Sequence, residues 1–230
     1  MSISFFKRTL GVRSCLYLLI FLCVVGIYTA FTWAMGDLYG YKVRYATSQW
    51  QERTDLPSLA EVVQAIDDAD AALRWESDNP EYKELKARSL YYRALINGPD
   101  SAGVADIREA ALLHRDAIEL RPRWPYSWAN LVLMKAHLGE VDDEYQHALE
   151  QAIRFGPWEQ SVHLSLTHAA VLSWSSLSRE QKGLYAENIE RGLVREFRAI
   201  RTTLDAYQKR SVICAYLKRS PKQKRLCVAK

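Results

Sequence analysis

The sequence predicts an all-α protein with one transmembrane helix near its N-terminus, followed by a short array of antiparallel helix pairs. Residues 14–36 carry no charged side chain over 23 positions. The rest of the chain has apolar residues at helical spacing and no convincing strand alternation. Two similar segments that end in proline, 117–122 and 152–157, begin 35 residues apart. We divide the chain into a short basic tail (1–13), a transmembrane helix (14–36), a juxtamembrane linker (37–56), a helical domain (57–200), and a short helix with a basic tail (201–230).

The uncharged stretch is long enough to cross a bilayer. At 1.5 Å per residue it would reach about 34 Å, against a hydrocarbon core of about 30 Å. A cleaved signal peptide is the alternative, but its apolar region would be only about 7 to 15 residues long. Thr32, Trp33 and Ala34 also make a poor cleavage site. We therefore favour an anchor that stays attached.

The orientation of this anchor follows from weaker signals. Basic residues are tied at three on each side, with Lys7, Arg8 and Arg13 before the span and Lys42, Arg44 and Arg53 after it. The short tail before the span, and Asp37 as the first charge after it, favour a cytoplasmic N-terminus. The helical domain would then lie outside the cytoplasm.

The segment after the anchor is aromatic and polar. We expect its aromatic side chains to sit at the membrane interface, where such rings are enriched; they are Tyr39, Tyr41, Tyr45 and Trp50. The folded domain is expected to start at residue 57 with a helix over 57–76, because Ser58 and Glu61 have capping-box spacing.

Three helix pairs follow, over 80–121, 123–155 and 158–200. Asn79 and Pro80 are typical of a helix start, and residues 97–100 (NGPD) indicate a turn. Ser178 and Gln181 would cap a long last helix, and a short helix would cover 203–217. The apolar residues of the long helix recur at close to fourfold spacing: Tyr185, Ile189, Leu193, Phe197 and Ile200.

The segment 117–158 resembles a tetratricopeptide (TPR) repeat. It has Trp128 early in its first helix, a break at Gly139, small residues in the second helix and a closing proline, which stacked helix pairs require. Val132 and Lys135 stand where the repeat consensus has glycine and tyrosine. We therefore expect a TPR-like array, in which about three pairs are close to the minimum for a stable solenoid.

A narrower resemblance lies in residues 121–131 (RPRWPYSWANL), 135–142 (KAHLGEVD) and 156–159 (GPWE). These segments are similar to the VpsP family of polysaccharide biosynthesis proteins, over roughly residues 57–200. The resemblance implies a small bacterial inner-membrane protein with one N-terminal span and a TPR-like body. It implies a role in making or exporting exopolysaccharide, as in a biofilm matrix, and it brings no catalytic residues.

The aromatic residues of this region are candidates for an interaction surface. Trp124, Tyr126, Trp128 and Trp158, with Glu159, could stack on sugar rings or bind a protein partner. The alternative, which we favour for most of them, is packing between helix pairs. Trp124 and Trp158 lie at helix starts and are the better candidates for exposure.

No motif for catalysis, cofactor binding or metal binding is present. Asp68 and Asp70 have the spacing of a metal-binding pair, but two residues apart on a helix they point in different directions. The five histidines are scattered, and neither a phosphate-binding loop nor a nucleophile elbow occurs. We expect no catalytic, cofactor or metal site, and hence no enzyme.

The charge is distributed in blocks along the chain. Residues 37–200 carry 19 basic and 26 acidic side chains, whereas residues 201–230 carry nine basic and one acidic. The basic end could attract anionic polysaccharide or lipid head groups, or it could be a solvated tail, which we favour. Its candidate ligands are Lys218, Arg219, Lys222, Lys224 and Arg225. The anchor and the scarcity of aromatic residues in this tail argue against nucleic acid as a partner.

The cysteines fall into two pairs. Cys15 and Cys23 lie in the span, where they act as small apolar residues. Cys214 and Cys227 could form a disulfide in an oxidising compartment or remain as two thiols in a reducing one, and the sequence does not separate the two cases.

These observations favour a membrane-anchored, non-enzymatic accessory or scaffold protein of exopolysaccharide biosynthesis or export. Its partners would be the membrane and protein components of the polysaccharide machine. Two alternatives stay open: a polysaccharide-binding protein that uses the aromatic cluster and the basic tail, and an envelope adaptor unrelated to polysaccharide.

Overall fold

The computed structural model describes residues 3–53 and 55–228, with side chains from residue 15 onward. Over this part of the chain it contains eleven helices and no strand, which confirms the all-α prediction. The first helix, α1, spans Ile3–Glu52. The others are α2 (Leu59–Trp75), α3 (Pro80–Asn97), α4 (Ser101–Leu120), α5 (Pro125–Leu138), α6 (Asp143–Phe155), α7 (Gln160–Ser173), α8 (Arg179–Gly192), α9 (Phe197–Ala206), α10 (Arg210–Cys214) and α11 (Pro221–Cys227).

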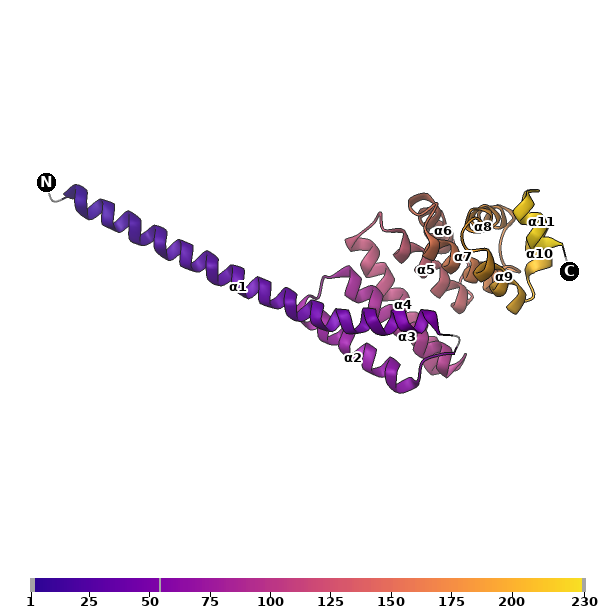
Figure 1. Ribbon diagram of the computed structural model, residues 1–230, viewed down its shortest axis with the longest axis horizontal. Helices are drawn as coiled ribbons and strands as arrows, with labels where there is room; N and C mark the ends of the chain where they lie inside the picture. Colours follow the sequence, from indigo (N-terminus) through magenta and orange to yellow (C-terminus); the bar gives the residue numbers. More distant parts are fainter. Residues whose placement is uncertain (1–2, 54, 229–230) are drawn as a thin grey trace.

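Helix α1 projects far beyond the rest of the molecule (Figure 1). Its described N-terminal part, from Cys15, is long and apolar enough to cross a membrane, and none of the other described residues buries the apolar stretch. Large side chains there are therefore exposed, such as Ile27 (71% exposed) and Phe21 (63%). The structure therefore confirms the prediction of an apolar helix of membrane-spanning length near the N-terminus.

The expected linker over 37–56 is instead the second half of α1, and this prediction is corrected. One face of α1 is buried at alternating spacings of four and three residues, against α2 and α3. Its members are Gly36, Gly40, Val43, Thr47 and Trp50. Trp50 does not sit at the membrane interface: it is 4% exposed and its ring contacts that of Tyr92, with centroids 5.0 Å apart. The folded body thus begins near residue 36, not at 57.

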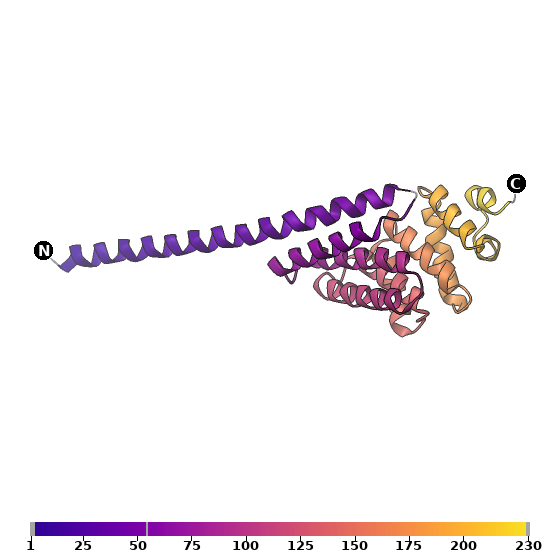
Figure 2. The same cartoon turned by 90° about the horizontal axis from the view of Figure 1, so that it is seen from below.

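The remaining helices stack as antiparallel pairs (Figure 2). The second half of α1 pairs with α2, and α3 with α4, α5 with α6, and α7 with α8 follow. Helix starts are where capping chemistry predicts them: Ser58 accepts a hydrogen bond from the Glu61 N–H, and Asn79 from the Glu81 N–H (3.0 Å). The last step differs from the earlier ones, because α7 packs chiefly on α5 and only slightly on α6.

The long helix predicted after Ser178 is broken in the structure. Helix α8 ends at Gly192, the chain turns, and α9 starts at Phe197 and folds back. The backbone of Gly192 lies so close to α9 that a Cβ there would come within 2.7 Å of the Ile200 side chain. The helix predicted over 203–217 is also divided, since α9 ends at Ala206, Gln208 has a φ of 54°, and α10 begins at Arg210.

The departure of Lys135 from the repeat consensus has a structural explanation. Its side chain is 2% exposed, and its ammonium group lies within 3.2 Å of a carboxylate oxygen in each of Glu140, Asp142 and Glu144. Arg115 of α4 forms two hydrogen bonds with the same Glu144 carboxylate. An ion cluster therefore fixes the turn between α5 and α6 to α4.

Candidate functional site

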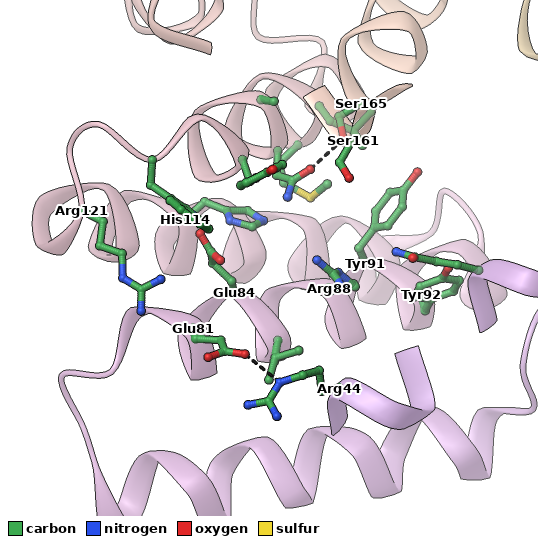
Figure 3. Close-up of a pocket in the computed structure, with 18 residues that line it drawn as sticks. Arg44, Glu81, Glu84, Arg88, Tyr91, Tyr92, His114, Arg121, Ser161 and Ser165 are labelled. Carbon is green, nitrogen blue, oxygen red and sulfur yellow. Dashed lines mark hydrogen bonds and ion pairs between the residues drawn. The ribbon is translucent and has the colours of Figure 1, made fainter. Parts of the chain in front are cut away.

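A hollow of about 580 Å³ lies between α3 and α5, and we call it the α3/α5 hollow (Figure 3). Two contacts join α3 and α5 beside it: Ser127 donates a hydrogen bond to Glu84, and Tyr91 Oη lies 3.3 Å from His137 Nε2. Its lining also includes residues of α1, α4 and α7. The lining consists of Arg44, Gln51, Glu81, Glu84, Leu85, Arg88, Tyr91, Tyr92, His114, Arg121, Trp124, Tyr126, Ala129, Asn130, Leu133, Met134, Ser161 and Ser165.

The stacking of first helices places these side chains together. Helices α1, α3, α5 and α7 are the first members of their pairs, and they contribute most of the lining. Helix α4 contributes His114 from the second layer. The hollow is therefore a property of the array, because no single pair contains more than part of it.

Three arginines line the hollow, and they differ in their partners. Arg44 forms ion pairs with Glu81 (2.8 Å) and Asp37 (3.1 Å). Arg88 and Arg121 form no ion pair with any carboxylate in the described part of the chain. Both are half-buried. Two positive charges in the wall of the hollow are thus left without direct neutralisation.

One acidic side chain, Glu84, lies near these two arginines. Burial raises the pKa of Glu84, and the hydrogen bond from Ser127 and the charges of Arg121 and Arg88 oppose this shift. Ser127 is fully buried and its hydroxyl already donates to Glu84, so it is not free to bind a ligand. The Ser127 and Glu84 pair therefore connects α5 to α3 and is not placed as a nucleophile and base.

His114 contributes a hydrogen-bonding group without a protein partner. It is 2% exposed, and burial, followed by the nearby charge of Arg88, lowers its pKa to about 3. Its ring is neutral at physiological pH, and Nδ1 has no hydrogen-bond partner among the described residues. A buried polar atom without a partner is uncommon, because leaving it unsatisfied costs about 1 to 3 kcal/mol.

Two of the predicted aromatic residues lie at the edge of this hollow. The rings of Trp124 and Tyr126 meet edge to face with centroids 5.0 Å apart, and the Arg121 guanidinium lies 5.6 Å from the Trp124 ring centre. The Tyr126 hydroxyl donates to the Glu159 carboxylate, and this bond, more than burial, raises the pKa of Tyr126 to about 12. Trp124, Tyr126 and Glu159 therefore form one group.

The other two predicted aromatic residues lie elsewhere. Trp128 packs edge to face on His147 and donates its indole N–H to the Pro122 carbonyl (2.9 Å), which is a packing role. Trp158 is 64% exposed and lines a separate depression with Arg191. The five residues of the predicted interaction surface thus do not form a single cluster.

The basic end of the chain is folded, with exposed charges. Cys214 and Cys227 form a disulfide that joins α10 to α11, and Ile213, Leu217 and Leu226 are buried in the core. The basic side chains of this end are exposed: Lys218, Arg219, Lys222, Lys224 and Arg225. This end lies opposite the free end of α1 (Figure 1), so its charges are far from the apolar helix.

Most residues of the α3/α5 hollow were not identified from the sequence. Arg44, Glu84, Arg88 and Arg121 read as ordinary solvated charges, and His114 as part of an apolar face. A signal does exist, because Glu81, Glu84, Arg88 and Tyr91 are spaced three and four apart along α3 and form a polar stripe. The stripe can be recognised as part of a site only when the positions of α5 and α7 are known, because these helices supply the facing residues.

No model of a known protein family matches the chain, and no curated protein matches it in sequence. Among the described residues, no group of three or more histidine, cysteine and acidic side chains is placed to hold a metal ion.

Proposed function

We propose that this protein is a membrane-anchored, non-enzymatic docking protein of a bacterial exopolysaccharide biosynthesis or export machine. A TPR-like array would present the α3/α5 hollow and its surrounding first-helix face to components of that machine. The observation that carries the proposal is the continuity of α1, which runs without a break from its uncharged stretch into the buried face of the array. An array attached in this way is held at a fixed distance from a membrane, which raises the local concentration of its binding surface there.

The resemblance of residues 121–131, 135–142 and 156–159 to the VpsP family supports the assignment to exopolysaccharide. The TPR-like assignment is supported by the stacked antiparallel pairs and by the shared first-helix face. Two features differ from a regular TPR array in this chain: Lys135 replaces the consensus tyrosine, and α7 packs chiefly on α5 and only slightly on α6.

We place the N-terminus in the cytoplasm and the array in the periplasm, with α1 in the inner membrane. The disulfide between Cys214 and Cys227 supports this orientation, because such bonds persist in oxidising compartments. Alkylating free thiols in whole cells, before and after reduction, tests the orientation. In a Cys15→Ser, Cys23→Ser variant, Cys214 and Cys227 should react only after reduction, and reaction beforehand would place the array in the cytoplasm.

A second candidate function is direct binding of the polysaccharide. It is favoured by one observation, the α3/α5 hollow with aromatic rings at its edge and two arginines without carboxylate partners. An envelope adaptor unrelated to polysaccharide would use the same anchor and array.

The main proposal is tested in the native host with three alleles. One deletes the gene, one restores it, and one replaces the uncharged part of α1 with a cleavable signal so that the array is released. Matrix polysaccharide should fall on deletion, return with the intact gene, and stay low with the released array. Unchanged matrix on deletion would instead support the unrelated adaptor. In-cell crosslinking from the first-helix face should capture polysaccharide-synthesis or export proteins.

A further inference from the structure

We propose that the α3/α5 hollow binds a short run of uronic-acid residues of an acidic glycan, with Arg88 and Arg121 binding carboxylates of the chain. The inference rests on the proposed function, in so far as that function brings the array to a polysaccharide. It adds the chemical class of the ligand and the residues that select it.

The charges of the hollow fit an anionic group. Arg44 is already neutralised by Glu81 and Asp37, whereas Arg88 and Arg121 share only the nearby Glu84 and pair with no carboxylate directly. These six side chains carry no net charge together, but Arg44 takes two of the carboxylates, and Arg88 and Arg121 are left without an ion pair among the described residues. A guanidinium binds a carboxylate through two parallel hydrogen bonds, so carboxylates of the ligand would satisfy the site.

The rest of the lining fits a sugar ring. Trp124 is 40% exposed and is braced by Tyr126, which leaves an aromatic surface at the edge of the hollow for the apolar face of a pyranose. On the opposite wall, Ser165 donates to the Asn130 side chain (2.9 Å), so the amide N–H groups of Asn130 stay free for ligand hydroxyls.

The buried histidine provides an independent indication of a ligand. His114 is one of the lining residues of the hollow, and its buried Nδ1 has no partner among the described residues. A ligand hydroxyl can either donate to or accept from a neutral imidazole, whichever tautomer is present. A sugar hydroxyl reaching this depth would satisfy the atom that the fold leaves unpaired.

The shape of the hollow favours a ring over an extended peptide. Peptides usually bind along a sheet edge or lie as a helix in a long apolar groove. Here α3 and α5 are joined by polar contacts of Glu84 with Ser127 and of Tyr91 with His137, which interrupt the groove between them. The hollow is lined by polar and apolar side chains from five helices, which suits a short run of sugar residues.

The test is calorimetric titration of the full-length protein in detergent micelles with three probes: tetragalacturonate, maltotetraose and tetraglutamate. The wild type should bind tetragalacturonate, and maltotetraose at least about tenfold more weakly, because it lacks the carboxylates. Arg88→Gln and Arg121→Gln should each weaken tetragalacturonate binding by about tenfold or more. Arg123→Gln is the matched control, since Arg123 is exposed beside Arg121 but does not line the hollow, and its affinity should be unchanged.

Several outcomes would overturn the inference. They are absence of tetragalacturonate binding, equal binding of maltotetraose, tighter binding of tetraglutamate, or an equal loss in Arg123→Gln. Arg121 lies at the end of α4 outside the helix, so Arg121→Gln keeps the test valid if Arg88→Gln does not fold. These results are independent of the matrix measurement above: a protein that binds no uronate but is required for matrix would retain its docking function.

Discussion

The backbone of Gly40 lies against the ring of Tyr82, so closely that a Cβ at residue 40 would come within 2.5 Å of Tyr82 Cε1. This contact joins the end of the apolar helix to α3. Gly36, one turn earlier, faces the same ring. The long apolar helix and the helix pairs therefore form one packed unit, and the direction of α1 fixes the orientation of the α3/α5 hollow.

We expect Gly40→Ala to destabilise the protein although alanine is the better helix former. The added methyl group must displace the buried Tyr82 ring, and overpacking of this kind costs about 1 to 3 kcal/mol. Gly183→Ala on the exposed face of α8 is the matched control, because a Cβ there meets nothing within 4 Å. That control should gain about 0.5 to 1 kcal/mol. Thermal unfolding in micelles, followed by circular dichroism, should show shifts of opposite sign; two increases would show that α1 is not packed on α3.

The sequence predicted some parts of this fold because the physical signals are local. Ser58, Asn79 and Ser178 cap helices through hydrogen bonds to backbone groups two or three residues away, and such pairs can be read directly. The buried face of α1 could not be read in this way. Gly36, Gly40 and Thr47 do not have large apolar side chains, and they are buried because α2 and α3 pack against this face of α1.

The candidate site illustrates the same limit. Arg44 belongs to the first helix pair, whereas Arg88 and the α4 C-cap residue Arg121 belong to the second, and their common location depends on how the two pairs pack together. The predicted aromatic residues lie apart for a related reason, although Trp124 and Trp158 are exposed as expected. Trp124 and Trp128 are one turn apart, but Trp124 lies at the edge of the hollow whereas Trp128 turns toward α6 and His147.

The ion cluster around Glu144 predicts a loss of stability in acid. The hydrogen bonds from Arg115, followed by the bond from Lys135, lower the pKa of Glu144 to about 2 from its ordinary value of 4.5. The unfolded chain therefore binds the proton more readily than the folded one. The stabilisation is complete above pH 4.5 and is lost as the pH falls from 4.5 toward 2.

Urea unfolding between pH 6 and 3 would measure this effect, with Glu144→Gln as the variant. Its free energy of unfolding should be lower than that of the wild type at pH 6, and the difference should shrink toward pH 3. Glu150→Gln, an exposed carboxylate on the same helix without an ion pair, should run parallel to the wild type. A constant difference between Glu144→Gln and the wild type would show that Glu144 does not act through its charge.

The disulfide should stabilise the end of the array more than the anchor end. Closing a loop of this size lowers the conformational entropy of the unfolded chain and so stabilises the folded state by roughly 3 kcal/mol. The disulfide also holds Leu226, which is 1% exposed, in its buried position. In a Cys15→Ser, Cys23→Ser background, reduction should expose α11 to trypsin at its basic residues. Cleavage within α3 to α5 should stay unchanged, whereas uniform cleavage would show that the whole array depends on the bond.

His114 predicts a second acid effect in a different pH range. Because burial lowers its pKa to about 3 from an ordinary value of 6.5, the unfolded chain takes up a proton between these values and the folded chain does not. Stability is therefore complete above pH 6.5 and falls by up to about 1.4 kcal/mol per pH unit below it. His114→Gln should reduce this slope between pH 6.5 and 5, measured by urea unfolding. His147→Gln is the control, because His147 is on the outer side of α6 against Trp128 and should leave the slope unchanged. If a uronate occupies the hollow and bonds to the neutral imidazole, adding tetragalacturonate at pH 6.5 should raise the stability of the wild type more than that of His114→Gln, which keeps Arg88 and Arg121. An equal rise in both would place the bound sugar away from His114.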